Sequence, residues 1–269
     1  MYMVTFNLRG SWAGDGINAF RHRAGEILDK IDQETPDVMA FQEVSPHIRE
    51  FLERHLPEYT FIGHGRNADF GGEALAIAVR KPTITLLSSS VFWLSPTPEV
   101  PGSRFADQSD CPRIVVSSLL ADKQTGLKFY VYNVHLDHIG EGARVAGIKQ
   151  LMERIDTDSQ LVKAPAFVLG DFNADPGSET IRFCESLGYA DLSPAEEATF
   201  HNFGRGTDDD GQFVKIDYIF ADAAARRYSS EGFLWTDCAD GIYLSDHYPV
   251  AAKVDLTQTI ALLNRGREH

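Results

Sequence analysis

The sequence lacks long apolar runs and cysteine pairs, and each absence excludes a class of protein. No stretch of about 18 consecutive apolar residues occurs, so we expect no membrane-spanning helix. The first residues show no basic region before an apolar one and read as a strand, so we expect no signal peptide and a cytoplasmic location. The 3 cysteines form no Cys-x-x-Cys pair, which argues against a disulfide framework and a structural zinc site.

Basic residues are also scarce. Acidic residues number 39 against 25 basic ones, for a formal net charge of −14. Proteins that hold long nucleic acids usually present a basic face, and no Lys/Arg cluster stands out here. Nucleic acid is therefore disfavoured as a partner without being excluded, because an acidic protein can still carry a local positive groove. No feature indicates a membrane or a protein partner.

Short runs rich in β-branched and aromatic residues dominate the chain, which is typical of strands. They cover residues 3–8, 38–42, 73–80, 84–93, 114–120, 128–135, 166–170, 214–220 and 249–254. Apolar periodicity predicts helices at 19–34, 46–56, 141–155 and 179–187, with a weaker pattern at 256–269. The mixture predicts an α/β fold of two packed sheets with helices outside. Without a low-complexity linker, we expect a single domain over residues 1–269.

Polar residues suited to metal or phosphate chemistry follow several of these strands. Any one of them alone is more typical of a turn or a cap. Their joint occurrence is informative, because strand ends at one edge of a sandwich can converge on one site. The six positions, in chain order, are Asn7, Glu43, His135, Asp171 with Asn173, Asp217, and Asp246 with His247.

The ordered motifs resemble those of the endonuclease/exonuclease/phosphatase superfamily, which includes deoxyribonuclease I, inositol polyphosphate 5-phosphatases, sphingomyelinases and deadenylases. The resemblance spans nearly the whole chain and implies a four-layered α/β sandwich, with two packed mixed β-sheets flanked by helices. It also implies Mg²⁺ or Mn²⁺ as the cofactor. The motifs are Asn7, Gln42-Glu43, Asn133-Val134-His135-Leu136, Gly170-Asp171-Phe172-Asn173, Ile216-Asp217-Tyr218 and Ser245-Asp246-His247-Tyr248-Pro249.

The resemblance also implies a role for each residue. Glu43 is the best metal ligand, because hard divalent cations prefer oxygen donors, and Asn7 and Asp246 would lie beside it. Asp171 would orient and deprotonate the attacking water, and Asn173 would hold the nucleophile or the phosphate.

The two histidines, His135 and His247, would bind the non-bridging oxygens and stabilise the transition state. An imidazolium needs a carboxylate partner to stay charged near neutral pH. Asp217 matches the family residue that pairs with His247, and Glu73 matches, less closely, the residue that pairs with His135. The sequence does not decide whether Asp171 or His247 is the base.

The sequence indicates the substrate less clearly than it indicates the reaction. The chain lacks an Arg-, Lys- or aromatic-rich insertion for DNA and an apolar hairpin for membranes. It resembles a compact bacterial branch that includes the maltose 6′-phosphate phosphatases. We therefore expect a phosphomonoesterase that acts on a small phosphorylated molecule such as a sugar phosphate. The alternatives are a metal-dependent nuclease or deadenylase, and an inactive binding module, against which the filled motif positions argue.

Five further residues are candidate substrate contacts. Arg113 and Arg144 would bind phosphate, although each is equally consistent with a surface ion pair. Trp93 would stack on a sugar or base, although core packing is the commoner role of such a residue. His138 and His201 would reach the site from neighbouring loops. Arg113 also ends the long irregular stretch 94–113, and loops of that length in compact domains are usually functional.

Overall fold

The computed structural model describes residues 1–11, 13–195, 197–207 and 211–257, so most of the weak helical pattern predicted at 256–269 lies outside the described residues. The helices are α1 (Phe20–Glu34), α2 (Pro46–His55), α3 (Glu141–Leu161) and α4 (Glu179–Ser186), with 3₁₀ turns at Ala13–Asn18 and Ala225–Arg227. None of these helices is both long enough and apolar enough to cross a membrane. The strands are β1 (Tyr2–Asn7), β2 (Val38–Val44), β3 (Tyr59–Ile62), β4 (Ala74–Arg80), β5 (Ile84–Trp93), β6 (Ile114–Asp122), β7 (Lys128–His135), β8 (Ala166–Asp171), β9 (Ala190–Asp191), β10 (Asp217–Ala221), β11 (Ser229–Leu234), β12 (Cys238–Ala239), β13 (Ile242–Tyr243) and β14 (Val250–Asp255).

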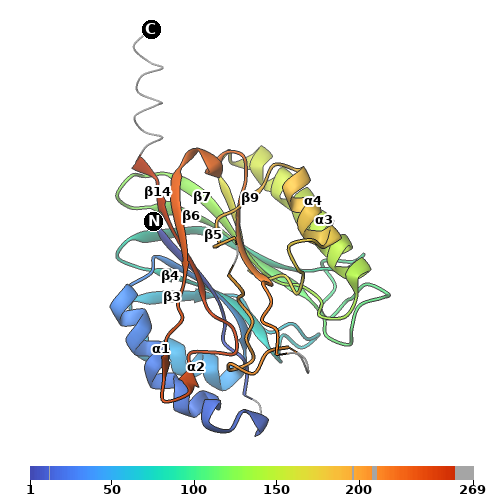
Figure 1. Cartoon of the computed structure of the whole chain (residues 1–269). Helices are drawn as coiled ribbons and strands as arrows, with labels where there is room; N and C mark the ends of the chain where they lie inside the picture. The colour runs from blue at the N-terminus through green and yellow to red at the C-terminus, as the bar shows by residue number, and fades with distance from the viewer. Residues whose placement is uncertain (12, 196, 208–210, 258–269) are drawn as a thin grey trace.

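Two six-stranded mixed sheets pack face to face. Their strand orders are β11-β14-β1-β2-β4-β3 and β5-β6-β7-β8-β10-β9. Helices α1 and α2 lie outside the first sheet, and α3 and α4 lie outside the second (Figure 1). The predicted four-layered α/β sandwich is therefore confirmed.

Apolar side chains fill all three spaces between the four layers, which is what stabilises the stack. The alternation of side chains along each strand sends one set between the sheets and the other set under the helices. Examples are Met3, Val116 and Leu169 between the sheets, Phe6, Ile27 and Leu52 under α1 and α2, and Tyr132, Ile148 and Ile181 under α3 and α4.

Two predicted boundaries differ from the structure by more than two residues, and strands β3, β9, β11, β12 and β13 were not predicted. Helix α3 continues to Leu161, well beyond the predicted end at residue 155, although Leu161 itself is exposed. The apolar stripe ends before the helix does, so periodicity alone stops too early. The strand predicted from residue 214 begins at Asp217, because Val214 instead pairs with Phe200 in an isolated bridge.

Strand register brings the polar strand ends to one edge of the sandwich. Strands β1 and β2 are parallel, as are β7 and β8, so their carboxyl ends lie together. In the second sheet His135 lies beside Asp171, and Asp217 lies opposite Asp171 on the antiparallel strand β10.

A buried amide pair joins the two sheets just beneath this edge. Gln42 Nε2 of β2 donates to Asn133 Oδ1 of β7 at 2.8 Å. Asn133 Nδ2 in turn donates to the carbonyl oxygens of Phe41 and Ala76, at 2.9 and 3.0 Å. Because all these polar groups are buried and satisfied, the pair fixes how the two sheets meet below the site.

Candidate active site

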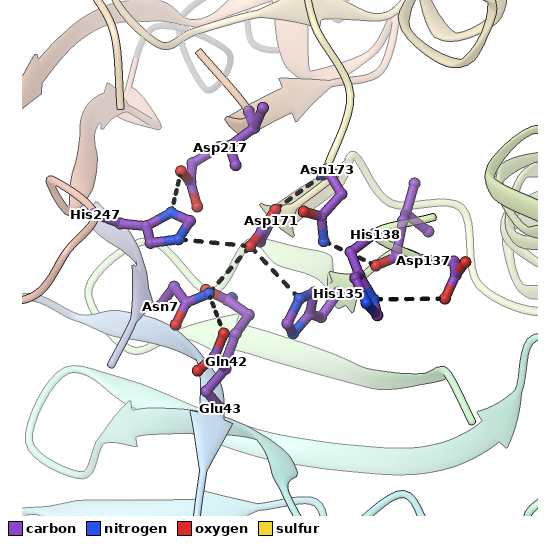
Figure 2. A network of polar contacts seen from close by, with 12 residues as sticks. Asn7, Gln42, Glu43, His135, Asp137, His138, Asp171, Asn173, Asp217 and His247 are labelled. Carbon is purple, nitrogen blue, oxygen red and sulfur yellow. Dashed lines mark hydrogen bonds and ion pairs between the residues drawn. The ribbon is translucent and has the colours of Figure 1, made fainter. Parts of the chain in front are cut away.

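The carboxylate of Asp171 lies at the centre of the converging side chains (Figure 2). Its Oδ2 accepts a hydrogen bond from Asn7 Nδ2 at 3.0 Å, across the space between the sheets. The same oxygen lies 3.5 Å from His135 Nε2 and 3.9 Å from His247 Nε2. Its Oδ1 accepts from the backbone N–H of Asn173 at 2.8 Å, so donors surround this buried carboxylate.

His247 is held in a charged state by carboxylates. Its Nδ1 lies 2.8 Å from Asp217 Oδ2, which also accepts the hydroxyl of Thr199 at 2.6 Å. Burial opposes the charged imidazole, but the negative charge and hydrogen bond of Asp217, together with Asp246 and Asp171, outweigh it and raise the pKa of His247 to about 10. His247 is therefore an imidazolium that presents Nε2 toward Asp171.

The pKa of Asp171 is raised, mainly because the carboxyl is buried and also because Asp217 is near. The charge of His247 acts in the opposite direction. A carboxyl tuned upward in this way can accept a proton from water more readily than an exposed aspartate. The geometry thus favours Asp171 over the protonated His247 as the base.

His135 differs from its prediction. Burial and the neighbouring positive charge of Arg113 lower its pKa well below the ordinary value, so the ring is neutral. The predicted partner, Glu73, instead binds Arg66, with Nη2 and Oε2 2.7 Å apart. The expectation that Glu73 keeps His135 charged was therefore wrong, because a loop arginine that the sequence did not single out takes the carboxylate.

Glu43 reaches the site through a distortion of its strand. The register between β2 and β4 shifts between Phe41 and Val44, and Glu43 has a φ of +56°. Such backbone outliers cost energy and cluster at functional sites. Glu43 Oε1 accepts from Asn7 Nδ2 at 3.1 Å and Oε2 from the backbone N–H of Gly10 at 3.0 Å.

Hydrogen bonds keep Glu43 ionised. Burial raises its pKa, but the Gly10 N–H, the charge of His247 and the Asn7 amide more than offset burial, and the net pKa is lowered. Asn7 uses its amide nitrogen to join Glu43 to Asp171, and its Oδ1 accepts the backbone N–H of Arg9 at 2.9 Å. In this arrangement Asn7 orients the two carboxylates, and its oxygen is engaged.

Arg23 holds the two loops that carry these groups. This buried guanidinium donates to the carbonyl oxygens of Leu8 and Arg9 on one loop and of Leu244 on the other, at 3.1, 3.0 and 2.6 Å. Asp246 follows on the second loop, and its Oδ2 lies 3.3 Å from Arg9 Nη1. Helix α1, which carries Arg23, thereby sets the distance between the loop after β1 and the loop before β14.

Two groups of side chains are candidates for holding a divalent cation. Asp171, Asp217 and His247 offer ligand atoms within 4.8 Å of one another. His247 is a poor ligand there, because a protonated imidazole has no lone pair to give and Asp217 already binds it. Glu43 and Asp246, which line one cavity, offer ionisable oxygens of the kind that Mg²⁺ and Mn²⁺ prefer. The donor set around Glu43 therefore fits the expected metal better.

A cavity of about 450 Å³ is lined by Glu43, Asp171, Asp246 and His247, whereas Asp217 is not among its described lining residues. A small recess of about 10 Å³, shared by Glu43, Arg113 and His135, adjoins it. Five wall residues had no predicted role. The full lining is Arg9, Glu43, Arg66, Glu73, Cys111, Arg113, His135, His138, Asp171, Asn173, Phe200, Ile216, Asp246 and His247.

Three residues at or near the site were not predicted, because their positions carry only weak signals in the sequence. Arg9 stands two positions after Asn7 at the end of a strand, and its φ of +50° turns it back toward the site. Arg66 lies in a loop whose sequence shows nothing to separate it from a surface arginine. Asp137 stands two positions after His135, and only its burial marks it out.

Three predicted substrate contacts do not lie on the described cavity wall. Arg144 pairs with Glu141 at 2.6 Å and donates to the Asp137 carbonyl. Trp93 is buried in the core, and its Nε1 donates to the Arg66 carbonyl at 2.8 Å. His201 is buried and stacked on Tyr248, with ring centroids 3.9 Å apart. Contact of these residues with a substrate does not fit this geometry, whereas Arg113 and His138 do line the cavity.

Comparisons with known proteins agree on one family. The model of the Endonuclease/Exonuclease/phosphatase family matches residues 4–247. An uncharacterized protein of Acanthamoeba polyphaga mimivirus is 27% identical over 256 residues, which cover 87% of this chain and 91% of that protein.

Two solved structures are similar over nearly their whole length. An endonuclease/exonuclease/phosphatase from Bacteroides vulgatus has a TM-score of 0.86 and 29% identity, covering 95% of this chain and 98% of that chain. A mannosyl-6-phosphatase of Bacteroides thetaiotaomicron has a TM-score of 0.83 and 26% identity, covering 95% of this chain and 100% of that chain.

Proposed function

Because the chain belongs to the endonuclease/exonuclease/phosphatase family, we propose that it is a divalent-metal-dependent phosphomonoesterase that acts on a small molecule such as a sugar phosphate. One observation carries the proposal. Asp171, with a raised pKa, touches both His135 and a charged His247 on the wall of a single cavity. Phosphoester hydrolysis requires a base for the attacking water, a charged hydrogen-bond donor for the phosphate oxygens, and acidic ligands for the metal.

In the proposed reaction Asp171 accepts the proton of the attacking water. Asn7 and the backbone of Asn173 orient its carboxylate. His247, charged through Asp217, donates Nε2–H to a phosphate oxygen as negative charge develops, and neutral His135 offers a second donor. Asn173 is itself fixed, because its Nδ2 donates to the Leu136 carbonyl at 3.0 Å.

The metal ion would be held by Glu43 and Asp246. When bound, it supplies a Lewis acid that neutralises the phosphate and stabilises the leaving oxygen. Asn7 fixes the orientation of Glu43, and Arg9 fixes that of Asp246. Because both ligands are anchored by side chains from β1 and the loop after it, they need little rearrangement on binding.

Cavity size and charge support a small substrate. A volume of about 450 Å³ lies within the range of roughly 300–1,000 Å³ that is usual for small-molecule sites. The net charge of −14 disfavours a long polyanion. The solved relative named as a mannosyl-6-phosphatase adds support for a sugar phosphate.

A phosphate-release screen with Mg²⁺ and Mn²⁺ tests this proposal. The panel contains hexose 6-phosphates, disaccharide phosphates, nucleotides, inositol phosphates and short single-stranded oligonucleotides. We expect the highest kcat/KM with a sugar phosphate. Cleavage of oligonucleotides with a higher kcat/KM than any monoester would favour the nuclease alternative, and no turnover of any compound would favour an inactive binding module.

A further inference from the structure

Arg113 is a buried arginine whose hydrogen-bonding capacity is largely unused. Its side chain is only 4% exposed. Nη2 lies 3.0 Å from His138 Nδ1, but Nε and Nη1 have no hydrogen-bond partner among the described residues. Buried guanidinium N–H groups without acceptors are costly, so their persistence points to a ligand that supplies oxygens.

The nearest carboxylate cannot satisfy Arg113. Asp137 Oδ1 lies 3.6 Å from Arg113 Nε, which is an ion pair without a hydrogen bond. Both Asp137 oxygens are already engaged, because they accept the hydroxyl and backbone N–H of Ser109 and the N–H groups of Ile139 and Gly140. Asp137 thus anchors the end of the long loop and positions Arg113 electrostatically while leaving its donors unfilled.

The neighbouring arginine is in a different state. Arg66 also lines the cavity, but its guanidinium binds Glu73 at 2.7 Å. Arg113 lines both the cavity and the adjoining recess, and it shares the recess with His135 and Glu43. The unfilled donors therefore belong to a group on the same wall as the side chains that would bind the phosphate.

The number of non-bridging oxygens on a phosphate indicates which ligand these donors fit. A terminal phosphate has three non-bridging oxygens and a charge of about −1.5 to −2 at pH 7, whereas a diester has two such oxygens and one charge. His135 and His247 suffice for two oxygens. A guanidinium presents parallel N–H groups that match a further phosphate oxygen and the additional charge.

We propose that Arg113 determines specificity for phosphomonoesters, by binding the third non-bridging oxygen, which a phosphodiester lacks. This inference rests on the proposed function and deepens it. It assigns the ligand of the unfilled donors as a terminal phosphate, and it makes Asp137 the positioning residue for Arg113.

A phosphomonoester and a phosphodiester that share the same leaving group test the assignment. With p-nitrophenyl phosphate and methyl p-nitrophenyl phosphate, the Arg113→Met variant is expected to lose about 100-fold in kcat/KM on the monoester and less than about 3-fold on the diester, as expected for charge-assisted hydrogen bonds. The retained diester rate shows that the variant is folded. Arg154→Met, on α3 and paired with Asp158 away from the cavity, is the control and should change neither rate.

Arg113→Lys is the second variant, in case the methionine variant does not fold. It keeps the positive charge but loses the planar guanidinium with its parallel N–H groups. It should lose about 10-fold on the monoester and little on the diester. Equal losses on both substrates, or no loss on either, would overturn the role of Arg113. If the wild-type enzyme hydrolyses neither compound nor any phosphoester in the screen, the proposed function itself fails, and the two failures are thus distinguishable.

Discussion

At the residue scale, the contact between Asp217 and His247 sets the pH up to which His247 stays charged. Asp217 is the largest favourable influence on the imidazolium, which burial alone would disfavour. Asp217→Asn should therefore lower the pKa of His247 and move the alkaline limb of the kcat–pH profile toward neutrality. We expect kcat at pH 8 to fall by about 100-fold or more, as when a general acid–base group is lost.

The control for this variant is Asp158→Asn, an acid on α3 that pairs with Arg154. Its pH profile should match that of the wild-type enzyme. An Asp217→Asn profile with an unmoved alkaline limb would show that His247 does not act as the charged donor.

A second residue-scale prediction concerns stability. Asp171 is a carboxyl with a raised pKa in the folded state, so its ionisation opposes folding increasingly as pH rises from its ordinary pKa to the raised one. Asp171→Asn should abolish phosphate release yet raise the Tm in chelator at pH 8 by about 2–4 °C, or roughly 1 kcal/mol for a domain of this size.

The gain in Tm should be smaller at pH 5, where the folded enzyme holds Asp171 protonated. Thermal unfolding at both pH values checks the sign. A variant that is less stable than wild type at pH 8, or one that retains activity, would contradict the role given to Asp171.

The individual partners of the site residues were only partly predictable. The family resemblance implied that Asp217 would pair with His247, and the two side chains do lie 2.8 Å apart. The pairing of Glu73 with Arg66 could not be predicted, because it depends on the path of an irregular loop. The unfilled donors of Arg113 depend on hydrogen bonds that Asp137 makes to backbone groups, and sequence patterns carry no information about these.

At the scale of the elements, the close approach of β7 and β8 sets the distance between His135 and Asp171. Gly170 allows this approach, because a Cβ atom there would lie 2.0 Å from the Val134 carbonyl oxygen. Gly170→Ala must push the strands apart, so we expect a loss of about 1–3 kcal/mol in unfolding free energy and a larger loss in kcat.

Gly177→Ala is the matched control, since a Cβ atom there would meet nothing within 4 Å. Chemical denaturation of both variants gives the comparison. If Gly170→Ala were as stable and active as Gly177→Ala, the spacing of the two strands would not matter to the site.

The four described α-helices and most of the longer strands were predicted from sequence patterns, whereas β3, β9, β11, β12 and β13 were not. Strand patterns of apolar residues that end in polar motifs predicted the two-sheet fold and the edge of the sandwich at which the site lies. Periodicity failed at the end of α3 and at the start of β10. In both cases the boundary depends on tertiary contacts or on backbone hydrogen bonds that side-chain patterns do not record.

At the scale of the whole molecule, we expect the excess of acidic residues and the arginines of the cavity to act on different classes of substrate. We expect the net charge of −14 to disfavour long polyanions, while Arg66 and Arg113 line the cavity. Raising salt from 50 to 200 mM should therefore change kcat/KM for the best small substrate by less than about 3-fold. Proteins with several phosphate contacts to DNA lose about 10³–10⁵ in affinity over that range.

Titration of a labelled single-stranded oligonucleotide over the same salt range completes this prediction. We expect weak binding at 50 mM salt. Tight binding with a steep salt dependence would support the nuclease alternative and would contradict a small substrate.

The most direct test of the central claim is metal-dependent phosphate release by purified wild-type protein with the best monoester of the screen. After treatment with a chelator, release should stop, and Mg²⁺ or Mn²⁺ should restore it. In Glu43→Gln, restoration should require a far higher metal concentration, because an anchored carboxylate ligand is lost. Undiminished release in the presence of the chelator, or a Glu43→Gln variant with an unchanged metal dependence, would contradict the account.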